Sequence, residues 1–291
     1  MATQAPPAAT APKPPPPKPS PPPPSGSAAK KSFAVEPASA PGGQIIVVYG
    51  PGGSGKTELC KLTKNAGLNP CFIDLENGAG FLKPEDEGLI PVADRLAPSP
   101  QSFQELRDAL HEDALWNRYD TVIVDSLTKV QEYAEAFVLA TVKAKGDRTV
   151  DSIGAYGFGD GLEHVYNKFL LILSDLDAIR RRGKHVICTA HECISKVPNP
   201  NSEDFIRYEP RLQSPQGGKA SIRHKVKEWC DHLLFIGYDV AVEDGKGKGA
   251  GTRAIYSTEL PTHMAKTRLL THPIPYTKAS TEVWKKLFNK E

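Results

Sequence analysis

The stretch that decides the fold is IIVVYG at Ile45–Gly50, which runs directly into GPGGSGKT at Gly50–Thr57. An apolar strand, a glycine-rich loop and a helix start follow one another here, in the order of a phosphate-binding P-loop. Glycine permits unusual backbone angles, which we expect at Gly50, Gly52, Gly53 and Gly55. Successive N–H groups of such a loop turn inward and form a nest for an anion. The pattern predicts a site for a nucleoside triphosphate.

The residues behind the loop and a later strand supply the groups that such a ligand needs. Lys56 is expected to reach the β- and γ-phosphates, and the hydroxyl of Thr57 to bind Mg²⁺. TVIVD at Thr121–Asp125 is an apolar strand that ends in an acid, and Asp125 can hold the same ion. ATP and Mg²⁺ are therefore the expected cofactors. The residues expected to bind them are Gly50, Pro51, Gly52, Gly53, Ser54, Gly55, Lys56, Thr57 and Asp125.

The carboxylate that acts on the attacking water is expected on a different strand. Ser126 rather than a glutamate follows Asp125, so this acid must come from elsewhere. Glu76 lies just beyond a short strand at 70–74, at the carboxyl edge where open α/β sheets bind ligands. We expect Glu76 to orient and polarise the water, the alternative being a solvated carboxylate at a strand end. For Asp74 the simpler expectation is a cap of the following turn.

Three more side chains are candidates for contact with the γ-phosphate. His191 ends a strand at 185–191. A polar side chain there can hydrogen-bond the γ-phosphate and so couple its hydrolysis to the segment that follows. The alternative is a structural histidine. Lys266 and Arg268 are two residues apart, so on a strand they would project to the same side. They could act as a trans finger on a neighbouring subunit's nucleotide, or be solvated edge cations. The catalytic candidates are Glu76, Lys56, Lys266, Arg268 and His191.

The segment from Ser195 to Ser221 is expected to be one long polar loop. Basic residues occur there among aromatic residues and glycines, which suits single-stranded DNA: cations contact phosphates and rings stack on bases. Three acids weaken this interpretation, and a plain surface loop is the alternative. A glycine-rich loop at 154–159 is a candidate for a second contact. The DNA-binding candidates are Lys196, Phe205, Arg207, Tyr208, Arg211, Lys219 and Arg223.

The first 43 residues differ in composition from the rest of the chain. They are mostly Pro, Ala, Ser and Lys, and such a segment buries too little apolar surface to offset its ordering entropy. We expect a disordered spacer, the alternative being a docking ligand for an aromatic groove. Four lysines and one glutamate give it a charge of +3, so with +2 for the whole chain the remainder carries −1. A DNA-binding surface must therefore be local.

Residues 44–291 have the length of one α/β domain. Strands are expected at 45–49, 70–74, 121–125, 185–191, 232–238 and 253–258, and helices at 102–116, 127–145, 162–182 and from about 280. Their alternation predicts a mostly parallel, twisted sheet with helices on both faces. A turn at 243–249 predicts an antiparallel edge hairpin. Five scattered cysteines and no apolar run of about 18 residues favour a cytoplasmic protein without a membrane span.

Together these stretches resemble the RecA-like ATPases of bacteriophages, the AAA domain proteins of the single-strand-annealing recombinase group. The resemblance covers about residues 44–275 and rests on YGPGGSGKT, FIDLENG, TVIVDSL, CTAHE, YEPRLQ, KEWCDHLLFIGYD and MAKTRLL. It implies a RecA-like P-loop NTPase core, ATP hydrolysis, a homo-oligomer and binding of single-stranded DNA, often beside a single-strand DNA-binding protein. It also implies Glu76 as the catalytic carboxylate and Lys266 with Arg268 as the trans finger.

Two departures from the family pattern limit what the resemblance implies. The proline-rich segment at 1–43 is not part of the family core, and the extra DNA-binding domain of full-length cellular RecA is missing. Annealing and strand exchange therefore both stay open, as do a ring and a filament. If the protein is encoded by a phage, the host cytoplasm is its expected location.

The sequence thus favours a DNA-dependent ATPase that assembles on single-stranded DNA in phage-type recombination or annealing. One alternative is a P-loop kinase of a nucleotide or small molecule. It requires an arginine-rich lid, for which the sequence offers the run at 180–182, and a basic helix end explains that run more simply. Another alternative is a nucleotide-gated loader or packaging accessory without catalysis.

Overall fold

The computed structural model describes residues 42–81, 94–243, 246–277 and 281–289, and every contact given below lies within these ranges. The chain divides into two compact units, Met1–Ala40 and Pro41–Glu291. The first unit, and with it nearly all of the segment predicted to be disordered, lies outside the described residues. The fold below is that of the second unit.

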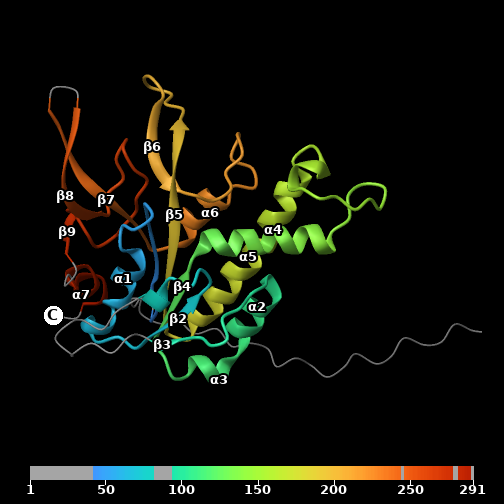
Figure 1. Cartoon of the computed structure of the whole chain (residues 1–291), viewed down its shortest axis with the longest axis horizontal. Coiled ribbons are helices and arrows are strands. Elements are labelled where there is room, and N and C mark those ends of the chain that lie inside the picture. Colours follow the sequence, from blue (N-terminus) through green and yellow to red (C-terminus); the bar gives the residue numbers. More distant parts are fainter. Residues whose placement is uncertain (1–41, 82–93, 244–245, 278–280, 290–291) are drawn as a thin grey trace, which may run out of the picture. The chain divides into compact units, whose positions relative to one another are not determined.

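A single sheet forms the centre of this unit, with the strand order β3-β2-β4-β5-β1-β7-β8-β9, and β6 pairs with β5 beside this path (Figure 1). The pairs among β1 to β5, and β1 with β7, are parallel, whereas β5–β6, β7–β8 and β8–β9 are antiparallel. The strands are β1 (Ile45–Gly50), β2 (Pro70–Asp74), β3 (Asp94–Arg95), β4 (Thr121–Asp125), β5 (His185–Val197), β6 (Phe205–Pro210), β7 (His232–Glu243), β8 (Lys246–Tyr256) and β9 (Ile274–Tyr276).

Helices cover both faces of the sheet, as predicted. One face carries α1 (Lys56–Lys61) and α7 (Glu282–Phe288). The other carries α2 (Phe103–His111), α3 (Asp113–Trp116), α4 (Leu127–Thr141), α5 (Asp160–Arg181) and α6 (Ile222–Trp229). The predicted α/β class, with a mostly parallel sheet and an antiparallel edge hairpin, is therefore confirmed.

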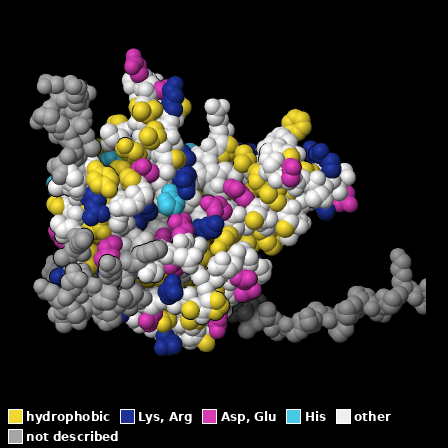
Figure 2. Space-filling model, viewed as in Figure 1, with side chains coloured by type: hydrophobic (Ala, Val, Ile, Leu, Met, Phe, Trp, Pro, Cys, Tyr) yellow, Lys and Arg dark blue, Asp and Glu magenta, His cyan; other side chains and the backbone are white. Residues whose placement is uncertain are grey.

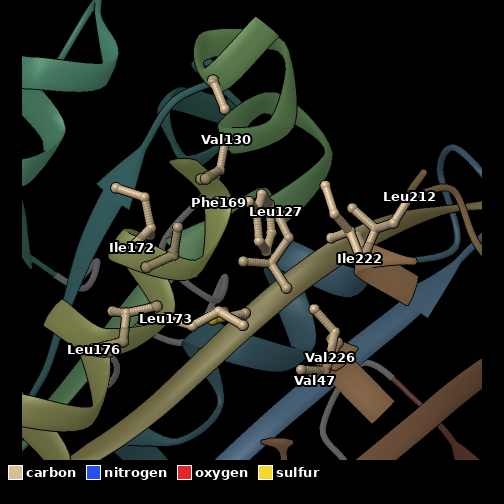
Figure 3. Packing of buried hydrophobic residues seen from close by; sticks show 14 of the residues in the cluster. Val47, Leu127, Val130, Phe169, Ile172, Leu173, Leu176, Leu212, Ile222 and Val226 are labelled. Carbon is tan, nitrogen blue, oxygen red and sulfur yellow. The ribbon is translucent and has the colours of Figure 1, made fainter. Parts of the chain in front are cut away.

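The central strand β1 shows why the sheet needs both helix layers. Its side chains alternate between faces: Ile45, Val47 and Tyr49 belong to the larger apolar cluster, and Ile46 and Val48 to the smaller one. All five are fully buried, which is the pattern of a parallel strand covered on both sides. Figure 3 shows side chains of α4 and α5 meeting over the sheet in the larger cluster.

The strand β5 is the main departure from the predicted elements. It runs on to Val197 and pairs with β6 from Glu192 opposite Pro210 to Val197 opposite Phe205. The prediction of one long loop at 195–221 is therefore wrong, because this segment contains the end of β5, all of β6 and the N-cap of α6. We call residues 192–210 the β5–β6 hairpin. It extends beyond the helix layers (Figure 1).

Smaller differences concern the ends of elements. The predicted helix at 102–116 is interrupted at Glu112 and forms α2 and α3, although its predicted cap is present, since Ser102 accepts a bond from the Glu105 N–H (3.2 Å). The strands β7 and β8 are longer than predicted, so most of the turn predicted at 243–249 is strand, and its tip at 244–245 lies outside the described residues. No described helix is long and apolar enough to cross a membrane.

Candidate nucleotide site

The P-loop between β1 and α1 owes its shape to three glycines, each for a reason that the structure shows. Gly53 and Gly55 have positive φ angles of 74° and 92°, which other residues rarely adopt. A Cβ on Gly50 would lie 2.5 Å from the carbonyl oxygen of Ile236, so Gly50 is needed for space. The expectation of an unusual backbone angle is confirmed at Gly53 and Gly55 and wrong at Gly50 and Gly52.

Lys56 is held inside this loop. Its ammonium donates to the carbonyl oxygens of Gly50 (3.0 Å) and Pro51 (2.8 Å). Burial lowers the pKa of Lys56, and the nearby carboxylates of Asp125 and Glu76 oppose that shift. An ammonium group carries three N–H donors. Two of them bond these loop carbonyls, which leaves the third for a phosphate oxygen beside Lys56.

Asp125 at the end of β4 is bonded by two hydroxyls. Thr57 donates to its Oδ2 (2.6 Å), and Thr189 of β5 donates to its Oδ1. Burial raises the pKa of this carboxyl, and both hydroxyl bonds oppose the shift. A carboxylate and a hydroxyl side by side are the hard oxygen ligands that Mg²⁺ prefers. Thr57 and Asp125 therefore fit the predicted metal position.

A cleft of about 300 Å³, the P-loop cleft, opens in front of these groups. Its lining brings together the predicted residues Gly52, Gly53, Gly55, Lys56, Thr57, Glu76, Asp125 and His191, and it adds Glu58 and Gly78, which were not predicted. The predicted residues lie at or just beyond the carboxyl ends of β1, β2, β4 and β5, because the carboxyl ends of parallel strands meet at one edge of the sheet. β5 lies between β1 and β4, which places Thr189 and His191 between the P-loop and Asp125.

Glu76 is fixed in this cleft by two donors. His191 Nε2 lies 2.9 Å from its Oε2, and the hydroxyl of Ser126 donates to its Oε1. The bond from His191 is the main reason that the pKa of Glu76 falls from 4.5 to about 2. Glu76 is therefore a carboxylate at neutral pH and can accept a bond from water. Asp74 behaves as expected and caps the next turn, accepting from the N–H groups of Gly78 (3.0 Å) and Ala79 (2.9 Å).

A second and larger cleft, about 620 Å³, adjoins the first and shares Glu76 and His191 with it. We call it the outer cleft. Its other lining residues are mostly polar and include Gln101, Lys129, Glu132, Tyr133 and Arg211. Arg211 is tied to the site through its backbone, since its N–H donates to the carbonyl of His191 (2.8 Å).

Lys266 and Arg268 lie away from this site within the chain. They do not share a regular strand, because Lys266 takes part in an isolated bridge with Leu233. The Lys266 ammonium donates to the carbonyls of Lys227 (3.0 Å), Glu228 (3.1 Å) and Cys230 (2.6 Å). A cation there stabilises the carboxyl end of α6. Arg268 is exposed.

Four of the predicted DNA-binding cations fall into two groups. Arg207 and Arg223 are mostly buried and both pair with Glu209, which is 3% exposed, and Arg207 also pairs with Glu259, so their charges are compensated within the fold. Lys196 and Lys219 have side chains that are 71% and 84% exposed. In the loop at 154–159, Tyr156 is buried and donates to a carbonyl of α4, whereas Phe158 is fully exposed.

The sequence does not reveal several contacts at this site. Ser126 stands where a catalytic glutamate could follow Asp125, and nothing in the sequence indicates that it donates to Glu76. Arg253 of β8 and Tyr276 of β9 donate to the carbonyls of Ser54 (2.6 Å) and Gly55 (2.7 Å). No spacing rule links residues some 200 positions apart, so only the folded sheet reveals these bonds.

The match to a protein family agrees with this geometry. A family model described as AAA domain matches residues 43–269. Among solved structures, the flagellar accessory protein FlaH from Methanocaldococcus jannaschii is similar over 80% of this chain and 88% of its own, at 13% identity and a TM-score of 0.35. No curated protein matches the sequence. Since the family match spans most of the chain and includes the P-loop, Glu76, Asp125 and His191, the chain belongs to the AAA domain family of P-loop ATPases.

Proposed function

We propose that this protein is an ATPase that acts on single-stranded DNA in phage-type recombination or annealing. The observation that carries the proposal is the continuity of β5. One uninterrupted strand, His185–Val197, holds Thr189 and His191 at the P-loop cleft and then forms one arm of the β5–β6 hairpin. A change at the nucleotide can therefore reach the hairpin through a single rigid element.

The residues at the cleft divide the work of hydrolysis. Gly50–Thr57 would hold the phosphates, and Thr57 with Asp125 would hold Mg²⁺, which when bound neutralises charge on the phosphates. Glu76 would orient and polarise the attacking water. Its lowered pKa makes it a weak proton acceptor, so orientation is its main contribution. His191 and Ser126 would set the position of its two oxygens.

The β5–β6 hairpin offers the surface for DNA. Ile194 and Ile206 are 65% and 68% exposed, and Tyr208 is also exposed. Lys196 lies opposite Ile206 in the hairpin register, and Figure 2 shows hydrophobic and basic side chains next to one another there. Exposed apolar and aromatic groups beside a cation suit bases and phosphates of a single strand. Phe205, opposite Val197 at the far end of the hairpin, would add a contact there, and Arg211 and Lys219 would add contacts along the segment that follows β6.

We further propose a homo-oligomer, ring or filament, in which Arg268 of one subunit completes the site of the next. Lys266 would support Arg268 by anchoring its segment to α6. A single-strand DNA-binding protein is the expected companion and the cytoplasm the expected location. Mixing Arg268→Ala subunits with Glu76→Gln subunits tests the shared site: hydrolysis should exceed that of either variant alone, because a Glu76→Gln subunit supplies Arg268 to the intact site of its neighbour. Hydrolysis no higher than in the separate variants would remove the trans role.

The decisive test is ATP turnover with and without single-stranded DNA at low salt. The proposal predicts faster turnover with DNA and a smaller increase for the Lys196→Ala, Tyr208→Ala double variant than for wild type. Arg182→Ala, a cation at the far end of α5, is the matched control and should keep the wild-type stimulation. Measurable turnover without any DNA stimulation of the wild type would refute the DNA role.

A P-loop kinase is the second candidate function, because the outer cleft offers room for an acceptor directly beside Glu76. This reading predicts phosphate on a second substrate instead of in water. Release of inorganic phosphate in a stoichiometric ratio to ADP, in the presence of nucleosides and small hydroxyl compounds, would exclude it.

A further inference from the structure

Three elements near the carboxyl end of the chain each place one hydrogen-bond donor on the segment Ser54–Leu59. Arg253 of β8 donates from Nη1 to the Ser54 carbonyl (2.6 Å), and Tyr276 of β9 donates from its hydroxyl to the Gly55 carbonyl (2.7 Å). Trp284 of α7 donates from Nε1 to the Leu59 carbonyl (2.7 Å). All three acceptors are backbone atoms of the P-loop or of α1, so these bonds fix backbone orientation.

Arg253 and Tyr276 form one unit behind the loop. The guanidinium lies 4.6 Å from the centre of the Tyr276 ring, a distance at which a cation and an aromatic face attract. Both groups touch Gly55 closely: a Cβ there would lie 2.7 Å from the Tyr276 hydroxyl and 2.8 Å from Arg253 Nη1. Gly55 is therefore required both by its φ of 92° and by these two side chains.

The bonded carbonyls determine where the neighbouring N–H groups point. In a trans peptide unit the C=O and the following N–H are fixed in one plane and point in opposite directions. Holding the carbonyls of Ser54 and Gly55 against Arg253 and Tyr276 turns the N–H groups of Gly55 and Lys56 the other way. Those N–H groups belong to the nest that receives the phosphates.

The helix behind the loop also depends on the same region. α1 has six residues, and a helix that short is unstable in water without tertiary contacts. Trp284 is fully buried and belongs to the same apolar cluster as Leu59 and Cys60. Its bond to Leu59 and this packing hold α1 in place, and with it Thr57.

We infer that Arg253, Tyr276 and Trp284 are positioning residues, which we call the C-terminal brace, and that they set the phosphate affinity of the P-loop. The inference rests on the proposed nucleotide binding at this loop. Tyr276 and Trp284 lie beyond residue 269, where the family match ends. The brace thus assigns a role in phosphate binding to residues outside the matched segment.

Three variants remove one bond each and keep most of the packing: Tyr276→Phe, Trp284→Phe and Arg253→Met. Losing one such bond should raise the Kd for Mg–ATP by about 3- to 10-fold. The Kd for Mg–pyrophosphate should rise by the same factor, because the brace acts on phosphate donors and not on a base. Both constants are measurable by calorimetry on the full chain, together with the melting temperature of each variant.

Trp116→Phe is the matched control. Trp116 is fully buried and donates from Nε1 to the Ala109 carbonyl (2.8 Å) of α2, so it loses the same kind of bond away from the P-loop. It should lower the melting temperature and leave both Kd values unchanged. Equal Kd increases in Trp116→Phe and the brace variants would overturn the inference, and so would wild-type Kd values in the brace variants.

Two further outcomes separate the brace from the proposed function. An increase in Kd for Mg–ATP but not for Mg–pyrophosphate would mean that Arg253 and Tyr276 contact the base or sugar, and it would overturn the brace alone. Wild-type protein that binds neither ligand would overturn the proposed ATPase function and the brace with it.

Discussion

Two charged clusters along β5 are built in opposite ways. At the P-loop cleft, Glu76 and Asp125 are held by neutral hydroxyls and by His191, and they face open space. At the base of the β5–β6 hairpin, Glu209 is enclosed by Arg207 and Arg223, and Arg207 also pairs with Glu259. The first cluster leaves negative charge for a cationic ligand to balance. The second balances its charges internally and so holds the hairpin to the domain.

The largest effect is expected from Glu76→Gln, a substitution in the first cluster. An amide keeps the shape but cannot polarise water as a carboxylate does, so kcat should fall by about 10²–10³-fold while the Kd for Mg–ATP stays within a few-fold of wild type. Single-turnover hydrolysis and calorimetry measure the two quantities. Glu112→Gln, at an exposed position between α2 and α3, is the control and should be unchanged. Wild-type kcat in Glu76→Gln would move the catalytic role elsewhere.

A substitution in the second cluster should lower the free energy of unfolding. Burial raises the pKa of Glu209, but the bond from Arg207 and the charge of Arg223 lower it on balance, so it is ionised at neutral pH. Glu209→Gln leaves the mostly buried guanidinium group of Arg223 without its carboxylate partner and takes from Arg207 the buried one of its two carboxylate partners, which should cost about 3–5 kcal/mol of unfolding free energy. Urea denaturation followed by circular dichroism measures this loss.

Glu259→Gln is the matched control for that experiment. Glu259 also pairs with Arg207, and with Lys227, but its side chain is 41% exposed. Exposed pairs contribute about 0–1 kcal/mol, so the control should remain near wild type. Equal losses in Glu209→Gln and Glu259→Gln would contradict the distinction between a closed and an open cluster.

The same contrast explains what the sequence could predict. Strand ends in a parallel sheet meet at one edge, so apolar runs that end in Asp74, Asp125 and His191 were sufficient to bring Glu76, Asp125 and the P-loop together. These strands are buried and have a strong hydrophobic pattern. The fold class and the core of the site were predictable for that reason.

The hairpin and the brace lacked such a signal. β6 and the end of β5 leave Ile194 and Ile206 exposed and contain many polar residues, so no buried face marks them as strands and a loop was the natural prediction. Spacing also identified Arg207, Arg223 and Lys266 as cations without showing their partners. Glu209 is only 2 positions from Arg207 and 14 from Arg223, but only the fold shows that its carboxylate contacts both guanidinium groups, and Lys266 meets the end of α6 36 positions earlier in the chain.

The Lys196→Ala variant tests whether exposed cations contribute to DNA binding in a way that enclosed cations do not. Removing one phosphate contact lowers the slope of log affinity against log salt by about 0.7 for a single strand. Lys196→Ala should therefore show a shallower slope and a weaker affinity for an oligonucleotide, with unchanged stability. Fluorescence anisotropy at several salt concentrations gives the slope. Lys285→Ala, exposed on α7, should keep the wild-type slope, and an unchanged slope in Lys196→Ala would remove this residue from the DNA surface.

The smallest expected effect appears at acidic pH and concerns the hydrogen bond between His191 and Glu76. A carboxyl whose pKa is lowered by folding stabilises the fold above its ordinary pKa, here 4.5, and loses that contribution as pH falls toward about 2. His191→Ala removes the largest cause of the shift, so the Glu76 pKa should rise, as measured by ¹³C NMR of its carboxyl. The stability difference between wild type and His191→Ala should be full at pH 7 and shrink between pH 4.5 and 2. A difference that stays constant over this range, with an unshifted Glu76 titration, would show that Ser126 and the surrounding charges fix the carboxylate, and that His191 only packs beside it.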